Sequence, residues 1–392
     1  MQRLSLSHQN VLECLRKINI NPGAEVSGED FFNRDKEFET FKKRLNSTRH
    51  IVISQIRRTG KTSFMKEFIQ RNTDYPIVYI IVQGCQNEQE FYMQIYKATI
   101  EHSKKLKTIN SIKTNWNKIS EIIPEVKGIK LGKIEYTTEQ ICKNLINLTH
   151  ENELILFIDE FPDFILNLKK DESVEPFLAN FRVFRNRCIN LKTVLTGSIN
   201  LTRTITNLGL PDKLNEYRTF KFPLFSSENS LLFFQCLIYS EDYTLEEKAK
   251  GYIFSLIKEG MPYFIQLLAD EVQQLEPESR ELKEEDLKNA VEAVFNSDEF
   301  GLEEFHNRLV IYLKEENLEK PAKIILSHLS NDDMGFEDLY PYVDKYLTKE
   351  KLDELLNRLQ DEAYIKKEED KYSFLSMLLA GWWNKNKHFD RS

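Results

Sequence analysis

The sequence predicts an α/β fold whose first 225 residues form a mainly parallel β-sheet with helices on both faces. Short apolar runs recur along this part, and segments with helical apolar spacing separate them, for example residues 61–70 and 88–103. Strands that alternate with helices are typical of parallel sheets, whose buried strands read as nearly continuous apolar runs. The predicted strands are residues 50–54, 77–82, 154–158, 191–195 and 219–222.

The sequence pattern changes after residue 225, because the regular succession of predicted strands stops there. Helical patterns at 227–239, 245–258, 263–275 and 284–295 predict a helical domain over residues 226–298. Three further helices (322–329, 337–342 and 349–359) precede a hairpin of residues 364–367 and 372–375, which is the set of elements of a winged helix. We therefore expect domains at residues 1–225, 226–298 and 299–392.

Two segments interrupt or precede the sheet pattern. A short amphipathic helix is expected at residues 11–18 and a longer one at 35–45. Residues 104–135 break the strand–helix rhythm with recurrent lysines, and we interpret them as an insertion that ends in a strand at 130–136. A charge run of this kind is a solvated face in most proteins, and a contact with a partner or nucleic acid is the alternative.

Composition limits the classes of function. The chain of 392 residues has a net charge of −8, which disfavours strong sequence-independent binding to nucleic acid. Its five cysteines are scattered without a CxxC pair, so we expect neither a zinc site nor a disulfide framework. The sequence shows neither a signal-peptide pattern nor an apolar stretch of membrane-spanning length, so a cytoplasmic protein is expected.

The strongest local motif is a phosphate-binding loop between the first strand and the following helix. Residues 55–62 read QIRRTGKT and match GxxxxGK[ST], except that Gln55 replaces the first glycine. Gly60 lets backbone N–H groups curl around phosphate oxygens, and the helix that starts at Lys61 directs its positive dipole end at them. Lys61 would contact the β- and γ-phosphates, and the Thr62 hydroxyl would bind Mg²⁺.

A second motif lies about 100 residues further on, at the end of the strand 154–158. This buried apolar strand ends in Asp159 and Glu160, and ligands of parallel sheets bind at the carboxyl ends of their strands. Asp159 would hold Mg²⁺, and Glu160 would act as the general base that activates the attacking water. The two motifs together predict binding of ATP with Mg²⁺.

A third signal is the strand end at residues 194–198, which carries small polar residues. In such a sheet, a residue there can hydrogen-bond the γ-phosphate or the attacking water, and we take Ser198 as the candidate. An ordinary boundary between a strand and a turn is the alternative.

The sequence resembles the STAND-type AAA+ ATPases, and within them the archaeal and bacterial group related to origin-recognition initiators. The similarity rests on blocks that span nearly the whole chain in the family's order. These blocks are residues 31–38 (FFNRDKEF), 56–63 (IRRTGKTS), 157–163 (FIDEFPD), 195–199 (LTGSI), 260–263 (GMPY) and 374–383 (FLSMLLAGWW). Two positions depart from the pattern: Gln55 and Asn33 stand where the family has glycine.

The resemblance implies further nucleotide-binding residues and an overall organisation. Residues 226–298 would be a lid over the nucleotide. Phe32 and Arg34 would lie against the adenine, and Pro262 would close over it from the lid. The loop residues that would surround the phosphates are Arg58, Thr59, Gly60, Lys61, Thr62 and Ser63.

The resemblance also implies an arginine finger, a residue that one subunit supplies to its neighbour's site. Arg182, Arg185 and Arg187 lie on the predicted helix before the strand 191–195, and Arg182 and Arg187 are the candidates that we retain as catalytic. Arg203 is a weaker candidate. Surface ion pairs are the alternative for each of them.

Three functions remain open at this point. The first is an ATP-driven switch that controls a protein partner or an assembly, including homo-oligomers, in bacterial signalling or antiphage defence. The second is an ATP-dependent DNA-binding initiator or transposition-type regulator. The third is a non-catalytic nucleotide-binding scaffold, which Gln55 favours and Glu160 disfavours. The balanced charges of residues 349–358 and 365–371 favour a protein partner over DNA.

Overall fold

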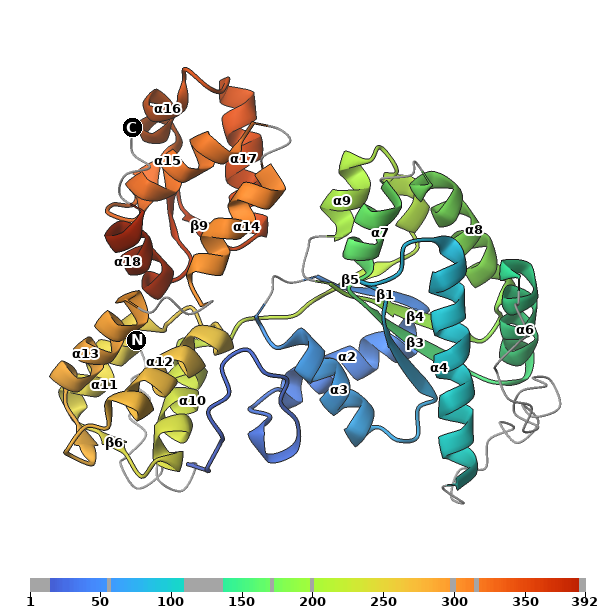
Figure 1. Cartoon of the computed structure of the whole chain (residues 1–392), viewed down its shortest axis with the longest axis horizontal. Coiled ribbons are helices and arrows are strands. Elements are labelled where there is room, and N and C mark those ends of the chain that lie inside the picture. Colours follow the sequence, from blue (N-terminus) through green and yellow to red (C-terminus); the bar gives the residue numbers. More distant parts are fainter. Residues whose placement is uncertain are drawn as a thin grey trace. The chain divides into compact units, whose positions relative to one another are not determined.

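The computed structural model describes residues 15–54, 58–108, 137–169, 173–197, 201–296, 301–313 and 317–387. The chain divides into two compact units (Figure 1). The first unit comprises residues 1–33, 58–60 and 224–392, and the second comprises residues 34–57 and 61–223. Each unit is described by itself.

The second unit contains a five-stranded sheet in the order β2-β3-β4-β1-β5. All four neighbouring pairs are parallel, which confirms the predicted α/β class. The strands are β1 (His50–Ser54), β2 (Ile77–Ile81), β3 (Leu154–Asp159), β4 (Leu191–Leu195) and β5 (Arg218–Lys221). Strand β4 lies between β1 and β3, so the strand that precedes the phosphate loop and the strand that ends in Asp159 flank it on either side.

Successive side chains of β3 point to opposite faces of the sheet, and helices cover both of these faces. The ring of Phe157 contacts Phe41 and Phe68 on one face, at centroid distances of 6.0 and 6.2 Å. Its neighbours Leu156 and Ile158 belong to the apolar core on the other face. Helices α2 (Asp35–Ser47) and α3 (Lys61–Arg71) supply the first face. The second core draws on α4 (Glu88–Thr108), α6 (Thr138–Glu151), α7 (Phe161–Lys169), α8 (Val174–Arg187) and α9 (Leu201–Asn207).

The first unit is mainly helical. Its elements up to residue 296 are η1 (Gly28–Asp30), α10 (Ser227–Ser240), β6 (Thr244–Leu245), α11 (Glu247–Leu256), α12 (Pro262–Leu275), β7 (Glu281–Leu282) and α13 (Glu284–Asn296). Its later elements are α14 (Glu303–Leu313), α15 (Glu319–Leu329), β8 (Met334–Gly335), α16 (Phe336–Val343), α17 (Lys349–Asp361), β9 (Ile365–Glu368), β10 (Lys371–Phe374) and α18 (Met377–Asn386).

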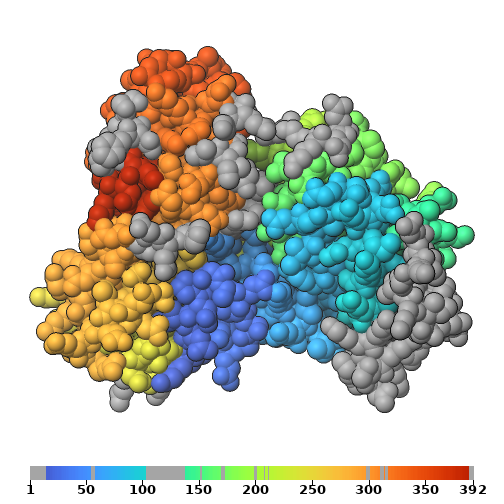
Figure 2. All heavy atoms as spheres, in the orientation of Figure 1, coloured from blue at the N-terminus to red at the C-terminus, as the bar shows by residue number. Residues whose placement is uncertain are grey.

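An N-terminal arm, residues 15–33, belongs to the first unit and runs along α10 and α12 (Figure 2). The backbone N–H of Ile18 donates to Ser240 Oγ at 2.7 Å, and the N–H of Asn21 donates to Gln266 Oε1 at 2.8 Å. Residues 15–18 are not helical, so the predicted helix at 11–18 is wrong over its described part. The backbone N–H of Ile18 thus donates to a side chain of α10, where a helix would have paired it with a backbone carbonyl.

Most predicted elements are found within a few residues of their expected bounds. The predicted hairpin is confirmed, because β9 and β10 pair antiparallel, and β8 adds a third strand to them. The predicted strand at 130–136 and nearly all of the 104–135 segment lie outside the described residues. Among the described residues, no helix combines the length and apolar composition needed to cross a membrane.

Candidate nucleotide-binding site

The phosphate loop has a backbone that only certain residues adopt easily. Arg58 and Gly60 both have positive φ angles, of 64° and 88°. A Cβ at Gly60 would meet no atom within 4 Å, so the left-handed backbone is the reason for glycine here. Helix α3 begins directly afterwards with Lys61, and Thr59, Lys61 and Ser63 are buried. Its first N–H groups are therefore placed as an anion site requires. Gln55 lies outside the described residues.

The two predicted Mg²⁺ ligands lie next to each other. Thr62 Oγ1, in the first turn of α3, donates to Asp159 Oδ2 at 3.1 Å. Tyr79 on β2 donates its hydroxyl to the same oxygen at 2.8 Å, and the backbone N–H of Glu160 donates to Oδ1 at 3.0 Å. Residues 97 positions apart in the chain thus form one polar site.

The electrostatics of Asp159 suit a cation. Its carboxylate is only 4% exposed, and burial raises its pKa above the usual value. The Glu160 charge adds to the rise in pKa, while hydrogen bonds from Tyr79 and Thr62 oppose it. A buried anion of this kind is stabilised by a positive ion beside it.

The residues present fit Mg²⁺ in particular. A hydroxyl and a carboxylate oxygen are hard ligands, and Mg²⁺ is usually bound by one or two protein groups together with phosphates and waters. In the described part of the chain, no cluster of three or more His, Cys, Asp or Glu side chains could hold a metal alone. Thr62 and Asp159 would therefore hold an ion that nucleotide phosphates complete.

Glu160 has a strained backbone and lies at the junction of two motifs. Its φ is 55°, which is uncommon for a residue with a side chain. A Cβ at Gly197 would come within 3.4 Å of Glu160 Oε2 and within 2.4 Å of Pro162 Cδ. Only glycine fits at 197, so the acidic strand end and the end of β4 pack directly against each other. Strain at such a residue is typical of functional sites.

Thr196 is a site residue that our reading of the sequence passed over in favour of Ser198, which lies outside the described residues. Its N–H donates to the Ile158 carbonyl and its carbonyl accepts from the Phe161 N–H, both at 3.0 Å. Its hydroxyl is buried, with the residue 2% exposed, and has no hydrogen-bond partner among the residues that the structure describes. A buried polar group of this kind calls for a ligand or a water. In the sequence, the signal for Thr196 was its small polar side chain within the block of residues 195–199.

The predicted adenine residues occupy structural positions. Arg34 is buried, and it donates to Glu37 Oε1 at 3.1 Å and to the Pro223 carbonyl at 2.8 Å. Its guanidinium lies 4.5 Å from the ring centroid of Phe222, so Arg34 ties the start of α2 to the end of the sheet. Asn33 has a φ of 41°, in the left-handed region that glycine and asparagine adopt more easily than other residues.

Phe32, the other predicted adenine residue, packs inside the first unit. Its ring lies 5.0 Å from Phe233 and 5.6 Å from Phe225, measured between centroids. Pro262 opens α12, where a proline is favoured because its missing N–H has no helical partner. The preceding Gly260 has a φ of 68°, and a Cβ there would lie 2.0 Å from the Phe225 carbonyl oxygen.

Arg58 also makes its described contacts within the first unit. Its guanidinium lies 3.8 Å from the ring centroid of Tyr263, next to Pro262 on α12. It forms an ion pair with Glu304 of α14. One residue of the phosphate loop is thereby connected to two helices that follow residue 224.

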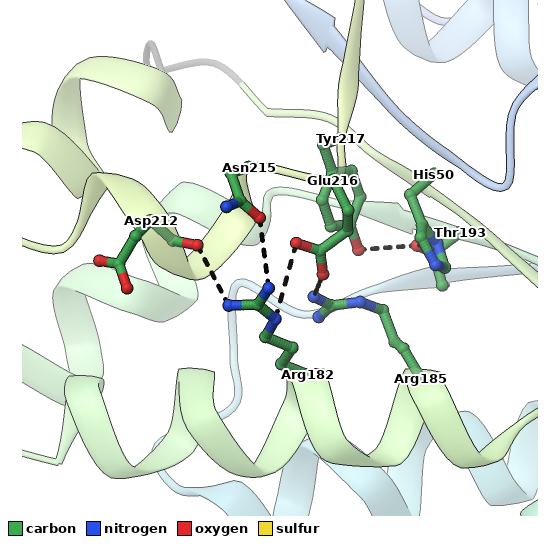
Figure 3. A network of polar contacts seen from close by, with 8 residues as sticks. All are labelled: His50, Arg182, Arg185, Thr193, Asp212, Asn215, Glu216 and Tyr217. Atoms are coloured by element: carbon green, nitrogen blue, oxygen red, sulfur yellow. Dashed lines mark hydrogen bonds and ion pairs between the residues drawn. The ribbon is translucent and has the colours of Figure 1, made fainter.

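The candidate arginine fingers fall into two groups, and Figure 3 shows the first, Arg182 and Arg185. Arg185 is fully buried in α8 and pairs with Glu216, with its guanidinium 4.2 Å from the Phe181 ring centroid. Arg182 points to the same carboxylate at 4.0 Å and donates to the Asp212 carbonyl at 3.4 Å. These two residues fasten α8 to the segment before β5. Arg187, in the last turn of α8, is exposed, and Arg203 on α9 is partly buried.

Comparisons with known proteins agree with this geometry. Residues 31–205 match the model of a family described as an ATPase domain predominantly from Archaea. No curated protein sequence matches the chain. Among solved structures, the Walker-type ATPase paby2304 of Pyrococcus abyssi is similar, with a TM-score of 0.63, 18% identity, and coverage of 93% of this chain and 98% of that one.

A second similar structure is the ORC2 protein of Aeropyrum pernix in ADPNP and ADP complexes. Its TM-score is 0.53 at 13% identity, with coverage of 92% of this chain and 94% of that one. Identities this low show a shared fold and not a shared role.

The family model covers residues 31–205, which is less than half of the chain, so it shows a similarity of this segment to that ATPase family. The fold of the chain is that of P-loop NTPases. The fold class predicted from the sequence is thereby confirmed.

Proposed function

We propose that this protein is a Mg²⁺-dependent ATPase that acts as a molecular switch. The observation that carries the proposal is the contact between Thr62 and Asp159, with the strained Glu160 directly beside it. Lys61 would bind the β- and γ-phosphates, and Thr62 and Asp159 would hold Mg²⁺. Glu160 would take the proton of the attacking water.

The γ-phosphate or the attacking water would be contacted from the end of β4. The buried Thr196 hydroxyl supports this role for Thr196, alongside the predicted Ser198. Arg187 is the finger candidate that its exposure supports, because a finger must reach a neighbouring subunit. For Arg182 to reach a neighbouring subunit, its guanidinium would have to give up its contacts with Glu216 and the Asp212 carbonyl.

The switch proposal rests on how the first unit is composed. It contains the predicted adenine residue Phe32, the predicted lid residue Pro262, the loop residue Arg58 and all the described elements after residue 224. The pairing of Arg58 with Glu304 supports a route from phosphate binding to the C-terminal helices. We infer that α15–α17 and the β8-β10-β9 sheet are a winged helix that engages a protein partner or a second copy.

The cellular setting of that partner follows from the resemblance to STAND-type ATPases, which is why we place it in signalling or antiphage defence. The scattered cysteines of the sequence, with no CxxC pair, support a reducing compartment such as the cytoplasm.

The test compares wild type with Glu160→Gln and the matched control Glu153→Gln, whose carboxylate pairs with Lys192 away from the site. Loss of turnover in Glu160→Gln alone, with ATP binding retained, is the expected result. Equal turnover in all three proteins would remove Glu160 from the mechanism. Absence of turnover in wild type with tight ATP binding would support the nucleotide-binding scaffold instead.

DNA binding is a second candidate function because one surface of the C-terminal elements favours it. Tyr342 and Tyr346 are 41% and 37% exposed, and Lys320 and Lys345 lie 5.2 and 5.1 Å from the Tyr346 ring centroid. Exposed aromatic rings beside cations are typical of surfaces that bind nucleic acid. Anisotropy of labelled DNA at rising salt tests this, and an ATP-dependent affinity that falls with salt is the result expected for an initiator.

A further inference from the structure

Tyr79 is a residue of the site that no motif contains. Within the described residues, Asp159 accepts three hydrogen bonds, and the bond from Tyr79, at 2.8 Å to Oδ2, is the only one from another strand. The other two donors are Thr62, itself a predicted metal ligand, and the backbone of the adjoining Glu160. Only Tyr79 therefore fixes Oδ2 from outside the two nucleotide-binding motifs.

The sheet explains why a tyrosine reaches this carboxylate. In the parallel pairing of β2 with β3, Ile81 is opposite Asp159 and Tyr79 is opposite Phe157. Residues two positions apart point to the same face and are about 6.6 Å apart along a strand. A tyrosine side chain spans that length, so its ring runs along β2 and its hydroxyl ends beside Asp159.

The hydrogen bond from Tyr79 orients the Asp159 carboxylate in a way that the other donors do not. Oδ1 accepts from the Glu160 N–H and Oδ2 from Tyr79, so both carboxylate oxygens would stay oriented when Thr62 turns its hydroxyl oxygen to the ion. Partners that orient a metal ligand in this way commonly change metal affinity or activity 10- to 100-fold when removed.

We propose that Tyr79 is a positioning residue for the metal-binding carboxylate of Asp159, and that it sets the affinity of the nucleotide complex for the divalent ion. This inference rests on the proposed function of the site. In this role Tyr79 acts through Asp159, to which its hydroxyl donates.

A purely structural role for the ring is the competing explanation. The Lys66 ammonium lies 5.7 Å from the Tyr79 ring centroid, and the side chain is half-buried at the edge of the sheet. The substitution Tyr79→Phe keeps the ring and the Lys66 contact and removes only the hydroxyl. Tyr75→Phe is a matched control, because it removes a hydroxyl that donates to Asn46 at 3.1 Å in the same unit, away from the site.

The experiment measures Mn²⁺ binding by electron paramagnetic resonance in wild type, Tyr79→Phe and Tyr75→Phe, each saturated with a non-hydrolysable ATP analogue. Affinity for the analogue in EDTA and the thermal unfolding midpoint are measured alongside. We expect Tyr79→Phe to bind Mn²⁺ about 10- to 100-fold more weakly, with the other two quantities equal to those of Tyr75→Phe.

The other outcomes are distinguishable. Equal Mn²⁺ affinity in all three proteins would overturn the role of Tyr79 and leave the proposed function standing. A parallel loss of Mn²⁺ binding, EDTA affinity and thermal stability in Tyr79→Phe would assign a structural role to the hydroxyl and overturn positioning. If wild type with analogue holds no Mn²⁺, the proposed function fails first, and the inference about Tyr79 fails with it.

Discussion

Acid should destabilise the sheet unit through one buried histidine. His50, the first residue of β1, shares a hydrogen bond of 2.8 Å with Thr193 Oγ1, which in turn contacts the Tyr217 hydroxyl at 2.7 Å (Figure 3). The pKa of His50 is lowered from 6.5 to about 4, chiefly by burial and also by the charges of Arg185 and Arg49, while Glu216 has a smaller opposite effect.

The size of the effect follows from linkage. The unfolded chain protonates His50 near pH 6.5 and the folded chain only near 4, so the unfolded state binds more protons between these values. Stability is therefore present above pH 6.5 and is lost as pH falls toward 4, with no further loss from this group below 4. A shift of this size corresponds to about 3 kcal/mol, at ~1.4 kcal/mol per pKa unit.

The assay is urea unfolding followed by far-UV circular dichroism at pH 7, 6, 5 and 4. The variant His50→Asn keeps a polar group for Thr193 but cannot titrate, so its free energy of unfolding should fall by about 3 kcal/mol less than that of wild type. His150→Asn removes an exposed histidine of the same unit and serves as the control. If wild type and His50→Asn lose the same free energy between pH 7 and pH 4, the reasoning about His50 is wrong.

Three further predictions concern packing, charge and backbone strain. Gly197→Ala should destabilise the protein by about 1–3 kcal/mol and reduce ATP turnover, because the new methyl group would overlap Pro162. An unchanged melting temperature together with unchanged ATP turnover would contradict this prediction. Arg185→Met should lower the free energy of unfolding by about 3 kcal/mol, because it breaks a buried ion pair. Arg187→Met should change that free energy by less than about 0.5 kcal/mol and reduce only ATP turnover. Calorimetry and turnover assays separate the two variants, and a larger loss of stability in Arg187→Met would refute the structural role of Arg185. Ala363→Gly should raise the free energy of unfolding by about 1 kcal/mol in a urea titration, because Ala363 has a φ of 52°; a lower midpoint would show that its methyl packing outweighs the strain.

Much of the sheet and of the phosphate loop was predictable because their signals are local. Apolar runs placed all five strands within about a residue of their ends, and Lys61 and Asp159 followed from the motifs around them. Tyr79 and the N-terminal arm were not predictable in this way. Their partners, Asp159 and Ser240, are 80 and 222 positions away, so no short pattern connects them.

Arg34 and Arg182 show that a motif does not specify all the contacts of a side chain. Arg34 was predicted to lie against the adenine, and the structure shows that it is engaged by Glu37 and the Pro223 carbonyl. Arg182 was predicted as a finger, and its guanidinium contacts Glu216. An arginine side chain is long enough to serve several partners, and the sequence does not record which partner the folded chain brings near.

The N-terminal arm has a consequence for biosynthesis. Residues 15–33 leave the ribosome before the other described residues, but Ser240, which accepts the hydrogen bond from Ile18, lies 222 positions later in the chain. At 5–20 residues per second this delay is roughly 10–45 s, and the sheet unit, encoded in between, is complete before the delay ends. During that interval a chaperone has the first access to the unpaired arm. Recombinant fragments that stop at Pro223 would retain an arm with no surface to cover, so a fragment of the sheet unit should begin at Arg34.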